Sequence, residues 1–173
     1  MKTRTTILAA LALSLALVAL ALRPAADVPQ RIGVFDSRAV AVACANSPSF
    51  RTVHAKLVER MKTAKEKGDA KEIAAIEREG MLRQVMMHEQ GFGKGSVAAM
   101  TALVKDSIAA LAVSENLSLV VSKWEVVYSA KDIELVDVTE KIAGFFGPNE
   151  RVKGWLKDLS KQEPIEDAFL IQD

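Results

Sequence analysis

The apolar and polar positions along the chain divide it into a short strand, a run of helices and a mixed C-terminal half. Residues 31–36, RIGVFD, place Ile32 and Val34 in alternation, which predicts a short buried strand. Residues 37–46 are rich in alanine and valine and predict a helix. Ser47-Pro48 interrupts that helix, because the residue before a proline avoids helical dihedral angles.

Two polar helices follow, over residues 49–66 and from Ala70 to about Gln90. In each, apolar side chains recur at helical spacing among many charges, so the apolar stripe is narrow. Gly68-Asp69 supplies the turn between them. The pattern predicts an antiparallel helical hairpin, an arm over about residues 49–90 that projects from a small body.

The C-terminal half predicts further helices and two strands. Glycines in GFGKGS end the arm, and residues 97–111 form a third, more amphipathic helix. Residues 117–121 and 126–128 read as a β-hairpin, and Asp137 with Glu140 has the spacing of a capping box at the start of a helix. A last helix spans residues 149–161, and we expect a loosely ordered tail beyond Pro164.

The predicted fold class is therefore α+β. A small β body, made of the N-terminal strand and the C-terminal β-hairpin, carries the projecting helical hairpin and an extra C-terminal helix. We divide the chain into residues 1–26, a domain over 27–147, and a C-terminal helix and tail over 148–173.

The N-terminus has the pattern of an export signal. Lys2 and Arg4 precede a run at residues 7–22 that is apolar except for Ser14. This predicts a protein that leaves the cytoplasm. The segment reads either as a cleaved signal peptide or as an uncleaved anchor in contact with the inner membrane, because the run is short for a span and the cleavage site is poor.

The net charge and the short sequence motifs limit which binding and catalytic functions the chain can have. Without Lys2, Arg4 and Arg23, the 23 basic side chains fall to 20 against 22 acidic ones, so there is no basic footprint for nucleic acid. GFGKGS lacks the spacing of a phosphate-binding loop, and no nucleophile motif is present. His54 and His88, predicted to lie on exposed helix faces, have no partner at metal-ligand spacing. We predict no catalytic residue, cofactor or metal.

Cys44 is the single cysteine, so an internal disulfide is excluded. The residue lies in the apolar segment AVAVACA. It reads either as a small apolar core residue or as a reactive thiol. Stability must then come from packing or from oligomerisation.

The order of these elements resembles the Skp or OmpH family of periplasmic chaperones. The similarity rests on the strand at 32–36, the strands at 117–121 and 126–128, and Asp137-Val138-Thr139 at a helix start. The resemblance implies a non-enzymatic homotrimer whose strands build a central body and whose arms enclose unfolded outer-membrane or envelope proteins. The body residues would be Ile32, Val34, Leu117, Leu119, Val121, Val126 and Tyr128.

On the arms, the candidate client-binding residues are Val53, Leu57, Met61, Ile73, Ile76 and Met81. The other reading of these residues is packing between the two arm helices. The arms are short for the family, and the chain after residue 26 is slightly acidic where the family is basic. An alternative function is therefore a membrane-tethered structural or adaptor protein that binds one folded envelope partner.

Overall fold

The structure, a computed structural model, describes residues 29–171. Its contacts separate Met1–Gln30 from a second compact unit, Arg31–Asp173. The predicted signal peptide or anchor at 1–26 lies outside the described residues. Among the residues that are described, no helix is both long and apolar enough to cross a membrane.

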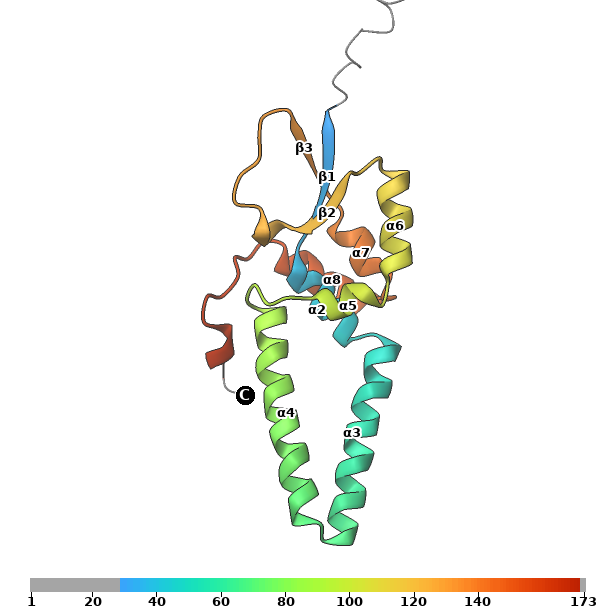
Figure 1. Cartoon of the computed structure of the whole chain (residues 1–173), viewed down its shortest axis with the longest axis vertical. Helices are drawn as coiled ribbons and strands as arrows, with labels where there is room; N and C mark the ends of the chain where they lie inside the picture. The colour runs from blue at the N-terminus through green and yellow to red at the C-terminus, as the bar shows by residue number, and fades with distance from the viewer. Residues whose placement is uncertain (1–28, 172–173) are drawn as a thin grey trace, which may run out of the picture. The chain divides into compact units, whose positions relative to one another are not determined.

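The second unit has the α+β composition that the sequence predicts, and its elements are shown in Figure 1. The strands are β1 (Gln30–Phe35), β2 (Leu119–Ser122) and β3 (Ile133–Asp137). The helices of the arm are α3 (Pro48–Lys67) and α4 (Ala70–Gly91). The body contains α2 (Ser37–Ala45), α5 (Ala98–Ala102), α6 (Lys105–Ser114), α7 (Thr139–Gly144), α8 (Glu150–Leu159), and the 3-10 turns η1 (Lys123–Glu125) and η2 (Ala168–Leu170).

The three strands form one parallel sheet in the order β2-β1-β3. The predicted β-hairpin is therefore wrong. Residues 126–128 are not a strand, and the strand that follows β2 in the chain is β3, on the other side of β1.

The hairpin fails because the chain after β2 is drawn towards the end of β1. Lys123 Nζ lies 3.0 Å from a carboxylate oxygen of Asp36, and Trp124 Nε1 donates to the other oxygen over 3.2 Å. These contacts hold residues 123–125 in the η1 turn instead of a hairpin loop. A partner almost ninety residues away in the chain leaves no local signal in the sequence.

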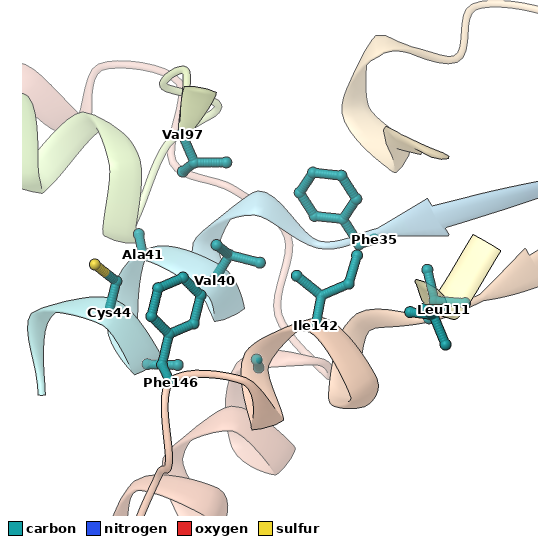
Figure 2. Close-up of a cluster of buried hydrophobic side chains, with 11 residues drawn as sticks. Phe35, Val40, Ala41, Cys44, Val97, Leu111, Ile142 and Phe146 are labelled. Carbon is teal, nitrogen blue, oxygen red and sulfur yellow. The ribbon is translucent and has the colours of Figure 1, made fainter. Parts of the chain in front are cut away.

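The hydrophobic core lies between one face of the sheet and the body helices. Figure 2 shows Phe35 of β1 near Val40 of α2 and Ile142 of α7. Val40 and Ile142 are both 0% exposed. Cys44, on α2, lies in the same cluster, and burial raises the pKa of its thiol, so it is a core residue and not a reactive one.

Helix α2 is the centre of the body, since it contacts α4, α7 and α8. The C-terminal helix α8 is thus part of the same compact unit, with Val152 only 1% exposed. The tail differs from the prediction of loose order. Residues 168–170 form η2 beside α4, Ala168 is fully buried, and Ile165 N donates to Phe92 O over 2.8 Å.

The third predicted helix is two helices, α5 and α6, with a break at Leu103 and Val104. Leu103 is 66% exposed at the break. The change of direction lets side chains from both pieces reach the core, among them Met100, Val104 and Ile108. A periodic apolar pattern cannot reveal such a break, because both pieces keep the helical period.

Candidate functional site

The arm helices begin and end where local capping chemistry places them. Ser47 Oγ accepts a hydrogen bond from Phe50 N at the start of α3, and Asp69 accepts one from Glu72 N at the start of α4. Gly68, with φ of 66°, ends α3 in the left-handed conformation that glycine adopts without strain. The chain reverses at Gly68 and Asp69 and returns along α4 (Figure 1).

Few side chains are buried between the two arm helices. Ala64 of α3 and Ile76 of α4 are each 3% exposed. Charged contacts supplement this packing: Arg60 pairs with Glu72 and Glu79 at 2.9 and 3.0 Å. Hydrogen bonds from Arg60 and Arg83 lower the pKa of the exposed Glu79 carboxyl. The far half of the arm is therefore held by a small contact and a surface ion-pair network.

The six candidate client-binding residues differ in how far they are exposed to solvent. Val53 and Met81 are exposed, at 47% and 66%. Ile76 is buried in the contact between the helices, so its role is packing. The remaining three are half-buried: Leu57, Met61 and Ile73.

An exposed apolar surface of the arm lies on α4, and we call it the α4 stripe: Met81, Leu82, Val85 and Met86. These side chains are 66%, 59%, 38% and 58% exposed. They form two pairs four residues apart, so they share one face of the helix. Only Met81 was among the sequence-based candidates. Its neighbours carry the same signal, but periodicity alone cannot tell an exposed apolar face from a buried one.

The tail continues this surface towards the body. Phe169 N donates to Glu89 Oε1 over 2.7 Å, and Glu89 lies four residues after Val85 on the same face of α4. Phe169 and Leu170 are 48% and 64% exposed. The sequence-based interpretation of the tail as loosely ordered missed this apolar extension.

A cleft of about 420 Å³ lies between α3 and α4 where the arm meets the body. Its apolar lining comes from Phe50, Val53, Leu57, Met86, Met87 and Met100. His54 is exposed and also lines this cleft. His88 is buried, at 8% exposed, with its ring 5.9 Å from that of Phe92. The prediction that His88 lies on an exposed face is wrong, because the end of α4 packs against α2.

Four of the seven predicted body residues lie on one side of the sheet. In the parallel register Ile32 pairs with Leu119 and Val34 with Val121, so these four side chains share a face. Phe35 points to the opposite, core-facing side. We call the first side the open face; Leu135 of β3 belongs to it too, because its neighbour Val136 packs on the core.

The open face is only partly covered. Leu119 and Leu135 are 52% and 44% exposed, and the other three side chains are half-buried. Parallel sheets usually have both faces buried, so a partly exposed apolar face on such a sheet is unusual. Leu117, just before β2, instead packs against the core.

The loop after η1 adds a second apolar surface. Val127 is 99% exposed and Tyr128 is 83% exposed, whereas Val126 is half-buried. These side chains lie in the segment predicted as a strand. Two apolar residues this exposed next to a sheet mark a surface suited to contact with another chain.

A buried ion pair ties the sheet to the C-terminal helix. Asp36, at the end of β1, binds the Arg38 guanidinium through both carboxylate oxygens, with the closest contact at 2.8 Å. Arg38 Nη2 also donates to Gln162 O over 2.7 Å. Burial acts to raise the pKa of Asp36, but hydrogen bonds from Arg38 and Lys123 outweigh it and lower that pKa. With its acceptors occupied, the carboxylate serves a structural role.

Two acidic residues that precede α7, Asp137 and Glu134, likewise make structural contacts. Asp137 Oδ1 accepts from Thr139 N over 2.8 Å, and Thr139 Oγ1 accepts from Asp36 N over 2.9 Å. Glu134 pairs with Arg31 across the sheet. In the range 29–171, no group of three His, Cys, Asp or Glu side chains is placed to hold a metal ion.

Comparison with known proteins places no further constraint on the site. No family model, curated protein or solved structure matches the chain.

Proposed function

We propose that the chain is an exported, non-enzymatic holdase of the Skp or OmpH type, which assembles as a homotrimer and holds unfolded outer-membrane or envelope proteins between its arms. The observation that carries the proposal is the α4 stripe, an exposed apolar face on an otherwise charged arm. Export rests on the charged and apolar pattern of residues 1–22.

The α4 stripe suits weak contact with many sequences. Two of its four side chains are methionines, whose flexible thioethers adapt to differently shaped apolar partners. The ion pairs of Arg60 and Arg83 with Glu79 place charged side chains on the same arm. Several such arms acting together would hold a client by multivalency, with little sequence preference.

The open face supports assembly. Burial of Leu119 and Leu135 against equivalent residues of other copies would complete the second layer that a parallel sheet normally has. Val127 and Tyr128 would extend the same contact. A trimer built this way brings three arms together around one space.

The test of holding uses the full chain and an unfolded outer-membrane barrel protein, with aggregation of the barrel followed by light scattering. Leu82→Glu with Val85→Glu should abolish protection, because two charges interrupt the α4 stripe. Val113→Glu is the matched control, since Val113 is 83% exposed but lies on α6. Full protection by the arm double variant, with its helical content unchanged, would refute the client surface.

Assembly is tested separately by sedimentation of the full chain at micromolar concentration. The expected species is a trimer, and Leu119→Glu with Leu135→Glu should convert it to monomers while Val113→Glu should not. A monomeric wild-type chain would overturn the assembly. A trimer that fails to protect the barrel would leave assembly intact and reject the holdase.

The cleft beside Met86 and Met100 favours a second candidate, a membrane-tethered adaptor. A hollow of about 420 Å³ could seat one anchoring side chain of a specific folded partner. An adaptor would ignore unfolded barrels, and Met100→Trp, which fills the cleft, would release its single partner. A holdase would keep its protection in the same variant.

A further inference from the structure

A second cavity, of about 600 Å³, lies in the body at the carboxyl ends of β1 and β2. Its walls come from these strand ends, the loop at 94–97, α5 and α6. In open parallel sheets, ligands bind outside the carboxyl ends of the strands. The volume is also in the range of small-molecule sites.

The cavity wall is mainly apolar. Phe35 and Val97 contribute buried side chains, and Ile108 and Val120 contribute partly buried ones. An occupant with an apolar body would therefore gain from leaving water.

Ser37, whose hydroxyl is buried, is one of the residues that line the same cavity. Ser37 is 3% exposed, and its Oγ has no hydrogen-bond partner among residues 29–171. Leaving a buried hydroxyl unpaired costs free energy, and nearly all such groups in proteins have a partner. A ligand that brings a hydroxyl or carbonyl group to Ser37 would remove this cost.

The exposed residues of the lining carry net positive charge. Lys94 and Lys105 are both exposed, and neither forms an ion pair within the described part of the chain. Glu125 contributes one opposing charge. The balance favours a ligand with a single negative charge.

The loop that carries Lys94 is fixed against the arm. Gly95 N donates to Glu89 O over 2.8 Å, and a Cβ at Gly95 would lie 2.7 Å from the backbone carbon of Glu89. Only glycine fits this approach. The close packing fixes the backbone of the loop next to Lys94, so the loop itself need not be ordered when a ligand binds.

We propose that this cavity binds a small organic carboxylate with an apolar body and a hydroxyl or carbonyl group at its other end. The carboxylate pairs with Lys94 and Lys105, the body contacts Phe35 and Val120, and the distal polar group bonds to Ser37. The proposal does not depend on the holdase function.

The test is calorimetric titration of the full chain with 3-(4-hydroxyphenyl)propionate. Two analogues each remove one contact: the amide of this acid lacks the charge, and 3-phenylpropionate lacks the hydroxyl. We expect the amide to bind at least about tenfold more weakly, and the deoxy acid about fivefold more weakly, from the usual worth of these contacts.

Matched variants assign each loss to its residue. Lys94→Gln with Lys105→Gln should weaken the acid but not the amide, and Glu125→Gln should tighten the acid. Ser37→Ala should weaken the hydroxy acid to the level of the deoxy acid and leave the stability unchanged or raised, because it removes an unpaired hydroxyl.

A substitution that fills the cavity tests where the ligand binds without changing a charged residue. Ala102→Trp occupies the cavity from α5, and Ala110→Trp is its control at an exposed position of α6 outside the lining. Binding should be lost in the first and kept in the second. No binding of the hydroxy acid to the wild-type chain, or binding unaffected by Ala102→Trp, would overturn the proposal.

Discussion

The body and the arm of this protein use apolar residues in opposite ways. In the body, Val40, Val138 and Ile142 are each 0% exposed and belong to one core. In the arm, Ala64 and Ile76 form the small contact between helices, while the α4 stripe remains in solvent. The core of the body encloses its apolar side chains, whereas many of those on the arm are exposed to solvent.

The difference follows from geometry. The core residues of the body lie between a sheet and several helices, so their apolar side chains find partners on several sides. Each arm helix has only one neighbour over most of its length, and one neighbour covers only part of its circumference. Any apolar residue outside that part is exposed, whatever its type.

The largest effect is expected at the buried ion pair of the body. Arg38→Ala leaves the Asp36 carboxylate buried without its bidentate partner and should lower the free energy of unfolding by about 3–5 kcal/mol. Chemical denaturation followed by circular dichroism measures this. A loss below about 1 kcal/mol, the typical worth of an exposed pair, would mean that Lys123 and Trp124 satisfy Asp36 without Arg38.

A matched pair of isoleucine substitutions compares the two regions directly. Ile142→Ala should cost about 2–5 kcal/mol and weaken the whole body, as a cavity in a packed core does. Ile76→Ala should instead lower hydrogen-exchange protection in α3 and α4 and leave the body protected. Equal loss of protection everywhere in both variants would show that arm and body unfold as one unit.

Acid should affect the body through Asp36. Because the folded-state pKa of Asp36 is lowered, its stabilising effect is complete above the ordinary aspartate pKa of about 3.9 and is lost as the pH falls through the lower folded value. Asp36→Asn should remove this part of the pH dependence of the unfolding free energy, which lies below about pH 4. An unchanged slope would contradict the assigned ion pair.

The smallest effect is expected in the ion pairs of the arm. Arg60→Gln removes both contacts to Glu72 and Glu79, yet should lower the stability least of these substitutions, because water screens the exposed charges. The loss should shrink further at 1 M salt. Denaturation of this variant at two salt concentrations checks it, and a salt-independent loss would point to packing of the Arg60 stem instead.

Much of the arm could be predicted from local sequence. The predicted helices at 49–66 and about 70–90 match α3 and α4 closely, because Ser47, Gly68 and Asp69 supply caps and a turn within a few residues. The strand at 31–36 and the start of β2 were likewise marked by their own side chains. These features need no distant partner.

Several features depended on tertiary contacts. The β-hairpin was predicted because VVYS has strand-forming residues, but Asp36 binds Lys123 and Trp124 and directs the chain into η1. The burial of Ile76 beside the exposure of Leu82, and the buried hydroxyl of Ser37, have no local sequence signal either.

The sequence by itself determined the helices of the arm, the α+β class and the residues available for a core, because propensities, caps and apolar periods act over a few residues. Only the tertiary structure decided the parallel order of the strands, the exposure of the α4 stripe and the shape of the two cavities. Those depend on which side chains distant in the chain come together, and a linear pattern does not record that.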